Sequence, residues 1–396
     1  MTSAQVIFWC CVAAVGYTYL VYPLILAVLA RVRGRAVRRE PFGGSVSVIV
    51  AAHNEQRRIA GRRDELIALL DASGLDGEVI IVSDGSTDAT AALALQDADP
   101  RVRVIELSQN VGKAQALTRA CAAAKGVILI FADARQRWAA DSIRQLLENF
   151  ADPRVGGASG ELCLQAASGA TAGVGLYWRY EKAIRKLESR IHSTVGATGA
   201  ICAVRRQLFQ PIPPRTILDD VYWPMRVAMQ GYRVVHDGTA RAFDRLPDSP
   251  GDEFRRKVRT LSGNFQLVCR LPALLLPWRN PLWWQFLSHK LMRLAVPWLL
   301  IAMLVISVML SGPVYRFALA AQVLGYLLAI AAVYSSRVAR FRLASVAASF
   351  LVLNAAACVA FWVWAFGRTG SSWRKVVYAA PPTAIARLQL ADRQHA

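Results

Sequence analysis

Three hydrophobic patterns follow one another along the chain. Val6 to Ala30 is an apolar run of about 25 residues without a charge, long enough to cross a ~30 Å hydrocarbon core. From Ser45 to about Pro250, short β-branched runs alternate with amphipathic stretches. After Gly251 the chain returns to long apolar runs. This pattern predicts a globular domain between membrane-spanning segments.

The middle region predicts an α/β fold. Four β-branched runs are typical of strands: Ser45–Ala52, Gly77–Ser83, Arg101–Leu107 and Gly126–Ala132. Helical patterns lie between them, at Arg57–Leu70, Asp88–Leu95 and Lys113–Ala124. Strands that alternate with helices in this way favour parallel βαβ units and a mostly parallel, doubly wound sheet.

Three further crossings are predicted at about Leu294–Leu310, Val314–Tyr334 and Ala344–Phe366. The stretch Leu271–Phe286, rich in Trp and Pro, suits the headgroup zone of a bilayer. Arginines follow the first apolar run at 31, 33, 35, 38 and 39, and a later run at 337, 340 and 342, as the positive-inside tendency predicts for cytoplasmic flanks. Four crossings would leave a basic tail outside, so an alternative is that one late segment is re-entrant or interfacial.

We therefore predict five parts: an N-terminal anchor (1–32), a cytosolic domain (41–266), an interfacial segment (267–290), about three transmembrane helices (291–368) and a tail (369–396). The expected location is an inner or plasma membrane, crossed several times, with the catalytic domain in the cytoplasm.

Composition narrows the function classes. The formal charge of +20 comes from 47 basic and 27 acidic residues, and much of this excess falls in the membrane flanks, which argues against nucleic-acid binding. The seven cysteines form no CxxC pair, so neither a zinc site nor a disulfide framework is indicated.

Polar residues collect where the predicted strands end. They are His53, Asn54 and Glu55 after the first strand, Asp84 after the second, Asn110 and Lys113 after the third, and Asp133 after the fourth. Ligands of doubly wound sheets bind beyond the carboxyl ends of the strands. Asp84 with Gly85 is compatible with either a plain turn or a ligand site.

The stretches "VSVIVAAHNE", "VIIVSDGSTDAT", "QNVGKAQAL" and "ILIFADA", in this order and spacing, resemble the nucleotide half of family 2 glycosyltransferases. That family has the GT-A nucleotide-sugar-binding fold, and its membrane members include cellulose, chitin and hyaluronan synthases. The resemblance covers roughly residues 45–266. It implies that the turn Ala52, His53, Asn54 and Glu55, together with Asp84 and Gly85, holds the nucleoside of a sugar donor, usually UDP, and that Lys113 lies close to the diphosphate.

The resemblance also implies a divalent cation. An Asp-x-Asp motif ends the fourth strand in that family, whereas this chain has Asp133, Ala134 and Arg135. Because Mg²⁺ often takes one or two carboxylates plus substrate phosphates, Asp133 alone can serve as the protein ligand of Mg²⁺ or Mn²⁺. Arg135 either supplies a fixed charge to the diphosphate or pairs with Asp141.

The stretch "TILDDVYWPMRVAMQGYRVV", Thr216 to Val235, is similar to the second-half signature of the family, in which the second of two acids is the catalytic base. This points to Asp220 as base and to Asp219 as a cap or supporting acid. An isolated acidic pair at a helix start is otherwise explained by the helix dipole. Nearby, Gly196–Arg206 resembles the acceptor border, and Trp178 and Tyr180 are either sugar-stacking or core aromatics.

One family motif is incomplete. Processive synthases carry Gln-x-x-Arg-Trp near the membrane, and the best match here is Arg256 to Thr260, which keeps the cation at Arg259 but has Arg256 for Gln and Thr260 for Trp. Arg256 and Arg259 either assist the leaving diphosphate or belong to a basic helix on anionic lipid.

The leading hypothesis is an integral-membrane, inverting glycosyltransferase that moves a sugar from a nucleotide-sugar donor to a glycan or lipid-linked acceptor in polysaccharide synthesis. Membrane lipid and a partner subunit for export are further expected partners. The alternatives are a catalytically degenerate donor-binding subunit and a transporter. The transporter is disfavoured because the late spans contain almost no ionisable residue.

Overall fold

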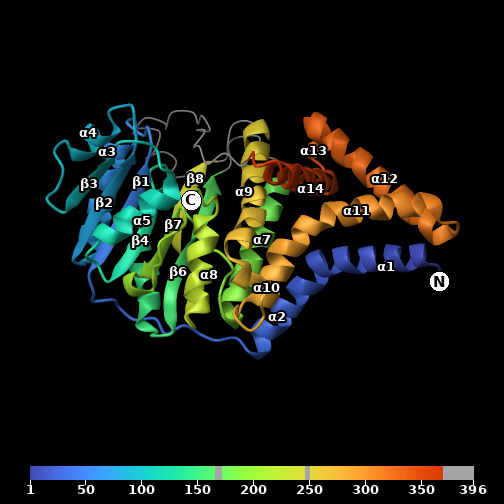
Figure 1. Ribbon diagram of the computed structural model, residues 1–396, viewed down its shortest axis with the longest axis horizontal. Coiled ribbons are helices and arrows are strands. Elements are labelled where there is room, and N and C mark those ends of the chain that lie inside the picture. Colours follow the sequence, from blue (N-terminus) through green and yellow to red (C-terminus); the bar gives the residue numbers. More distant parts are fainter. Residues whose placement is uncertain (166–171, 246–249, 369–396) are drawn as a thin grey trace, which may run out of the picture.

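The protein is elongated, with a sheet domain at one end and long apolar helices at the other (Figure 1). The structure, a computed structural model, describes residues 1–165, 172–245 and 250–368. The predicted tail, 369–396, lies outside these residues.

One eight-stranded sheet forms the domain, with strand order β3-β2-β1-β4-β7-β6-β8-β5. Its strands are β1 (Val46–Ala52), β2 (Gly77–Asp84), β3 (Val102–Leu107), β4 (Ile128–Asp133), β5 (Arg137–Trp138), β6 (Val155–Gln165), β7 (Ile201–Arg205) and β8 (Arg233–Arg245). Strands β3, β2, β1 and β4 are parallel, as are β6 and β8, whereas β7 is antiparallel to both of its neighbours. The predicted α/β fold with a mostly parallel sheet is confirmed.

Alternate residues of β1 explain why helices cover both faces of the sheet. Val48 and Val50 pack in one core with α3 (Ile59–Ser73) and α6 (Ser142–Glu148). Ile49 and Ala51 pack in a second core with α5 (Lys113–Ala123) and α8 (Asp219–Met229). Successive strand residues point to opposite faces, so a central strand that is apolar throughout can bury both. Helices α4 (Thr90–Leu95), α5 (Lys113–Ala123) and α8 (Asp219–Met229) complete the layers.

Four helical segments are long and apolar enough to cross a membrane: Ser3–Val32, Trp283–Met309, Pro313–Tyr334 and Arg342–Ala365. They comprise α1 (Ser3–Gly16) with α2 (Tyr22–Val32), α10 (Trp283–Gln285) with α11 (Met292–Met309), α12 (Pro313–Tyr334) and α14 (Arg342–Ala365); α13 (Ser336–Ala339) is a short link. The second segment begins at Trp283, within the stretch predicted to be interfacial.

The first segment changes direction between α1 and α2 (Figure 1). A π-helical turn, Tyr17–Val21, lies at the bend, and Pro23 follows in the first turn of α2. Proline lacks the N–H that a continuing helix needs, so the wider turn before it is a physical cause of the bend.

A buried polar network joins the membrane segments to the domain. Two carboxylates of α7 (Ala172–Ile191) hold it together: Glu181 Oε1 lies 2.9 Å from His289 Nε2, and Glu188 Oε1 lies 2.8 Å from His289 Nδ1. Tyr22 of α2 donates to Glu188 at 2.7 Å, and Arg293 of α11 donates to Glu181 at 2.7 Å. Because buried carboxylates are costly without partners, this network fixes how α2, α7 and α11 dock.

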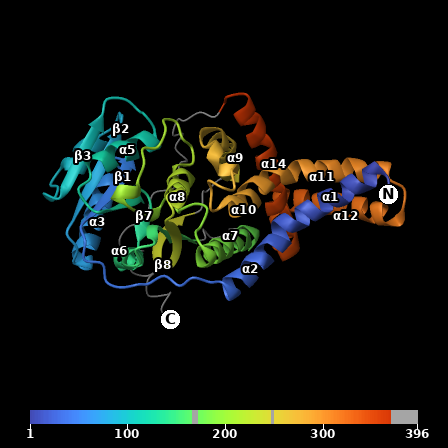
Figure 2. The same cartoon turned by 60° about the horizontal axis from the view of Figure 1, so that its bottom comes forward.

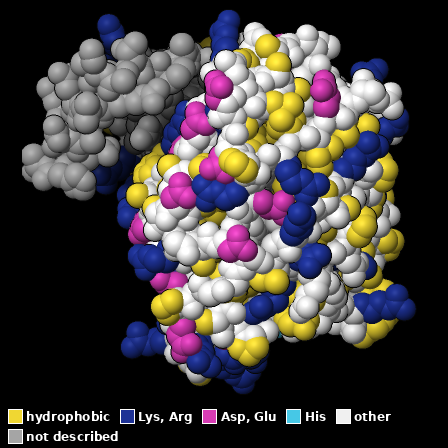
Figure 3. Space-filling model, turned by 90° about the vertical axis from the view of Figure 1, so that its left-hand side faces the viewer, with side chains coloured by type: hydrophobic (Ala, Val, Ile, Leu, Met, Phe, Trp, Pro, Cys, Tyr) yellow, Lys and Arg dark blue, Asp and Glu magenta, His cyan; other side chains and the backbone are white. Residues whose placement is uncertain are grey.

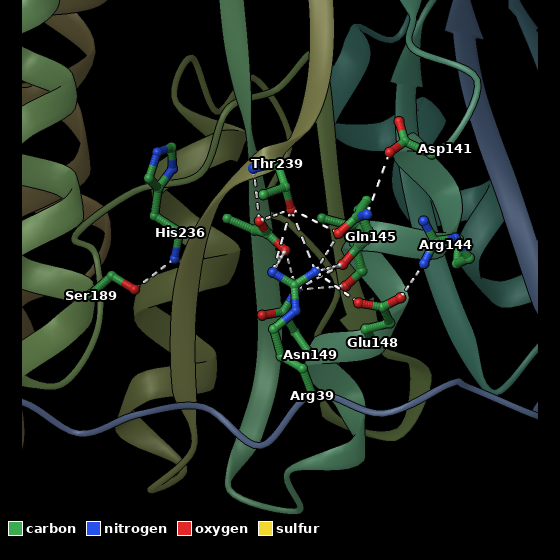
Figure 4. Close-up of polar contacts among 11 residues, drawn as sticks. Arg39, Asp141, Arg144, Gln145, Glu148, Asn149, Ser189, His236 and Thr239 are labelled. Atoms are coloured by element: carbon green, nitrogen blue, oxygen red, sulfur yellow. Dashed lines mark hydrogen bonds and ion pairs between the residues drawn. The ribbon is translucent and has the colours of Figure 1, made fainter.

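The connection from α2 to β1 runs along the domain as a strap (Figure 2). Its main anchor is Arg39, whose guanidinium contacts Glu148 at 3.0 Å and Asp237 at 3.1 Å and also donates to Gln145 (Figure 4). Arg38, in contrast, pairs only with the exposed Glu40 among the residues that the structure covers. Arg39 was predicted to belong to the basic flank of the first apolar run. The structure shows that it also anchors the strap to the sheet domain.

The domain face turned away from the membrane helices mixes both signs of charge (Figure 3). Arg103 beside Glu78 and Arg101 beside Asp71 and Asp99 are examples of such pairs. The +20 charge is therefore not concentrated as one uniformly basic surface on this face.

We expect Arg39→Ala to lower the free energy of unfolding by about 1–2 kcal/mol, because charge-assisted hydrogen bonds to Glu148 and Asp237 are lost. Thermal unfolding in detergent and limited proteolysis of the strap measure the effect. The matched control is Arg38→Ala, which removes the same charge one residue away and should change neither. Equal behaviour of the two variants would contradict the anchoring role.

Candidate active site

The turn after β1 is held against the loop that follows β2. His53 Nδ1 lies 2.8 Å from the carbonyl oxygen of Asp84, and Asn54 Oδ1 accepts from the backbone N–H of Thr87 at 2.7 Å. Asn54 has a positive φ of 54°, a conformation that asparagine tolerates well. The structure thus brings together two predicted nucleoside-binding segments, Ala52–Glu55 and Asp84–Gly85.

Asp84 supports the next loop from beneath. It is 0% exposed, and its two carboxylate oxygens each accept a backbone N–H at 2.8 Å, from Val111 and from Gly112. Gly85 has a φ of +58°, and a Cβ there would lie 2.2 Å from Asn110 N. Only glycine allows the two loops to approach so closely. Asp84 therefore places the start of α5, where Lys113 is the first helical residue.

Lys113 joins two of the predicted acids. Its Nζ lies 2.7 Å from Asp133 Oδ1 and 4.0 Å from Asp219 Oδ2. Asp133 ends β4, whereas Asp219 begins α8. Residues far apart in the sequence thus meet at the carboxyl edge of the parallel strands.

Asp220 completes this group, which we call the lysine–carboxylate cluster: Lys113, Asp133, Asp219 and Asp220. A Cβ added to Gly199 would lie 3.6 Å from Lys113 Nζ and 3.8 Å from Asp220 Oδ2. Gly199 therefore lies close to both the lysine and the acid, within Gly196–Arg206, the stretch that resembles the acceptor border of the family. The backbone N–H of Ala197 donates to the carbonyl of Asp220 at 2.7 Å, which fixes the start of α8 against that stretch.

Burial and charge set the ionisation of the cluster. Burial raises the pKa of Asp219, and the carboxylates of Asp220 and Asp133 raise it further, against the opposing charge of Lys113. Burial also raises the pKa of Asp220, which Lys113, Lys290 and Arg185 partly offset. Burial alone would lower the pKa of Lys113, but Asp133 and Asp219 outweigh it and raise that pKa. The cluster holds one cation among three acids and so favours a further positive charge.

The partner of Arg135 within the described part of the chain is not Asp141. Arg135 forms a bidentate pair with Asp244 of β8, with Nη2 to Oδ2 at 2.7 Å and Nε to Oδ1 at 3.1 Å. The pairing with Asp141 is therefore wrong. Because Asp244 lies 111 residues from Asp133, its partnership with the strand end carried no local sequence signal.

Arg62 of α3 is a supporting residue that sequence reasoning missed. It is 0% exposed, and its Nε donates to the carbonyl of Asp133 at 3.1 Å. Its guanidinium also lies 4.7 Å from the centre of the Trp138 ring. Fully buried arginines are rare in proteins. In the sequence, Arg62 cannot be distinguished from an arginine on the solvent-exposed face of a helix.

The two arginines of the incomplete motif, Arg256 and Arg259, lie on helix α9 (Pro250–Arg270), and the aromatics Trp178 and Tyr180 lie on α7. Arg256 pairs with Glu253 at 2.8 Å, whereas the side chain of Arg259 is exposed. Tyr180 donates to the carbonyl of Tyr19 at 3.0 Å, and the ring of Trp178 lies 5.3 Å from Lys257 Nζ. These contacts favour the structural interpretation of the two aromatics over sugar stacking.

Oxygen ligands for a divalent cation are present but few. Within residues 1–165, 172–245 and 250–368, no group of three or more His, Cys, Asp or Glu side chains forms a metal site. Lys113 places its ammonium group on Asp133, the predicted ligand, so a positive charge already occupies that position. One carboxylate fits a cation that takes its other ligands from phosphate and water.

The fold and the lysine–carboxylate cluster define an α/β domain whose charged side chains gather at the carboxyl edge of a sheet. Residues 47–212 match the family model described as Glycosyl transferase family 2, so the chain carries a family 2 glycosyltransferase domain.

Two curated relatives illustrate the range of similar proteins. A dolichyl-phosphate beta-glucosyltransferase of Drosophila melanogaster is 43% identical over 98 residues, which cover 22% of this chain and 30% of that protein. A poly-beta-1,6-N-acetyl-D-glucosamine synthase of Staphylococcus aureus (strain COL) is 24% identical over 238 residues, 57% of this chain and 56% of the relative. The chain thus spans only about a third to about half of these relatives.

A solved structure matches nearly the whole fold. A mannosyltransferase from Pyrobaculum calidifontis, in complex with GDP-Man and Mn²⁺, superimposes with a TM-score of 0.72 at 20% identity. The match covers 92% of this chain and 99% of that one, so the shared fold extends beyond the sheet domain into the long apolar helices.

We expect Asp84→Asn to lower the free energy of unfolding by about 2 kcal/mol without any ligand, because an amide offers one acceptor oxygen to two backbone N–H groups. The melting temperature in detergent should fall by about 5 °C. The control is Asp64→Asn, whose side chain is 65% exposed beside Arg63. Unchanged apo stability of Asp84→Asn, with only nucleotide binding impaired, would show that Asp84 serves the donor rather than the loop.

Proposed function

We propose that this protein is an integral-membrane glycosyltransferase that transfers a sugar, with inversion, from a nucleotide-sugar donor to a glycan or lipid-linked acceptor. A UDP-linked sugar is the proposed donor. The observation that carries the proposal is the convergence of Lys113, Asp133, Asp219 and Asp220 from three separate elements of a family 2 domain.

The donor side of the site comprises the turn Ala52–Glu55 and the loop supported by Asp84. The nucleoside lies against these segments in our proposal, with the diphosphate directed toward Lys113 at the N-terminus of α5. Helix N-termini and lysine side chains both favour phosphate, since each presents positive charge and N–H donors. This placement would bring the sugar between the donor segments and α8.

Asp220 is the proposed base. The acceptor hydroxyl oxygen attacks the anomeric carbon, and the bond from that carbon to the diphosphate oxygen breaks with its electron pair leaving on the nucleoside diphosphate. The acceptor proton passes to the Asp220 carboxylate. A raised pKa makes a carboxylate a stronger base, so the burial of Asp220 supports this role.

Asp133 is the proposed protein ligand of Mg²⁺ or Mn²⁺, with donor phosphate and water as the remaining ligands. When bound, the cation neutralises charge on the diphosphate. Lys113 would then exchange its contact with Asp133 for one with the departing diphosphate, because both are anionic partners within reach of one flexible side chain.

The Asp220→Asn variant should lower kcat by about 10²–10⁴-fold, because the amide keeps the shape of the side chain but cannot accept the proton. Transfer of radiolabelled sugar from UDP-, GDP- and dTDP-linked donors by purified protein provides the measurement. Nucleotide binding, measured by calorimetry, should be retained. Equal transfer by variant and parent would remove Asp220 as base, and no transfer by the parent from any donor would favour a degenerate donor-binding subunit.

Removal of divalent cations with EDTA should abolish transfer, and added Mg²⁺ or Mn²⁺ should restore it. The Asp133→Asn variant should need a higher cation concentration for half-maximal rate, because one charged ligand is lost. Asp71→Asn, an acid that is 59% exposed and pairs with Arg101, is the control. Full activity in EDTA would contradict the metal proposal and leave Lys113 as the main charge at the diphosphate.

A further inference from the structure

A cavity of about 270 Å³ lies between α9 and α14. Phe254 and Val258 of α9 and Val359 and Val363 of α14 form apolar walls, with Ile217 at the side nearest α8. Small-molecule sites typically have volumes of about 300–1,000 Å³, so this cavity suits part of a ligand rather than a whole lipid. We call it the α9–α14 cavity.

Three arginines also line the α9–α14 cavity: Arg255, Arg259 and Arg368. Arg255 pairs with Asp252, and the guanidinium of Arg368 lies 5.9 Å from the centre of the Phe366 ring. Arg259 forms no ion pair with any residue that the structure describes, and its side chain is exposed. An apolar cavity lined by three arginines matches a ligand that has a hydrocarbon part and an anionic group.

One wall of the cavity opens toward the membrane part of the protein. Helix α14 is one of the four segments suited to crossing a membrane, and Val359 on it is 42% exposed. Phe265 of α9 stacks on Trp364 of α14, with ring centres 5.3 Å apart, and this contact holds the two helices together beside the cavity. A lipid chain can therefore lie along α14 while its polar end meets α9.

The other side of the cavity lies close to the proposed base. The backbone N–H of Ile217 donates to Gln266 of α9 at 3.0 Å, and a Cβ on Gly263 would lie 2.7 Å from Leu218 Cγ. Helix α9 thus packs directly on the segment that leads into α8. Ile217 precedes Asp220 by three residues, and three residues of chain span at most about 10 Å. A sugar phosphate whose phosphate lies near Arg259 is long enough to bridge about 10 Å from the cavity to Asp220.

We propose that the α9–α14 cavity binds the phosphate and the adjoining hydrocarbon of a lipid-linked acceptor, with Arg259 as the phosphate-binding residue. The inference rests on the proposed function in naming the ligand an acceptor, and it deepens that function by assigning the acceptor class. The lipid chain leaves the cavity along α14, and the sugar joined to the phosphate extends past Ile217 to Asp220.

The test measures binding directly, without catalysis. Purified full-length protein in detergent is incubated with a diazirine-labelled hexadecyl phosphate, irradiated and digested, and the labelled peptides are identified by mass spectrometry. Labelling should fall on α9 and α14. Hexadecanol with the same label tests for purely apolar binding, and excess phosphatidylglycerol or inorganic phosphate tests for bulk lipid or free phosphate as the true occupant.

Two pairs of variants make the test specific. Arg259→Gln should weaken binding of the labelled phosphate about tenfold, whereas Arg279→Gln, an equal charge change at another exposed arginine, should leave it unchanged. Val363→Trp should block labelling by filling the cavity, whereas Val346→Trp, on the same helix at a 39% exposed position, should not. Thermal unfolding of each variant confirms that it is folded.

Equal labelling by the alcohol, full competition by phosphatidylglycerol or by inorganic phosphate, or equal effects within either variant pair would overturn the proposal. Failure of the proposed function is distinguishable, because Asp220→Asn would then leave sugar transfer unchanged whatever the labelling result. Conversely, an active enzyme whose Arg259→Gln variant binds the lipid phosphate normally would retain the function and lose this site.

Discussion

The arrangement of the site depends on one electrostatic constraint. Asp133, Asp219 and Asp220 come from elements that share no local sequence, and three carboxylates repel one another when they are brought together out of water. Lys113 makes the grouping feasible, with its ammonium 2.7 Å from one acid and 4.0 Å from another. Its position depends in turn on Asp84, which holds the loop in front of α5 by two backbone hydrogen bonds. The strand end, the loop and the helix start thus form one mutually dependent unit.

Helix α9 connects this unit to the membrane segments. Gln266 and Arg270 of α9 both contact residues 214–217, a stretch that ends two residues before Asp219. On its opposite side, α9 packs on α14 through Phe265. The start of α8 is therefore supported by a helix that also contacts one of the four long apolar segments.

The sequence predicted the strand ends well because the responsible signals are local. Asp84 and Asp133 each follow an apolar β-branched run, and the parallel sheet then brings such ends to one edge. The sequence predicted less about which contacts each side chain makes at that edge of the sheet. The two backbone N–H groups that bind Asp84 lie 27 and 28 residues further along the chain, and Asp244, which pairs with Arg135, lies 109 residues further. No periodicity encodes these contacts.

Residues with no recognisable pattern were missed for the same reason. The sequence around His289 carries no pattern that indicates its role, yet the side chain lies between two buried carboxylates of α7. Arg62 and Arg185 occupy ordinary helical positions in the sequence, and only packing shows that the first supports Asp133 and that the second acts on Asp220. The four apolar segments, in contrast, were predictable from the sequence, because crossing a bilayer requires a helix of a certain length and an apolar composition.

The buried network at α7 also has a consequence for biosynthesis. Glu181 and Glu188 leave the ribosome well before His289 and Arg293, which lie about a hundred residues further along the chain. Until those later residues emerge, Glu181 lacks both His289 and Arg293, and Glu188 lacks His289. The globular domain can acquire its sheet during translation, but α7 cannot dock in its final place until the second apolar segment has been made. Assembly of the membrane junction is therefore necessarily a late step in the maturation of this protein.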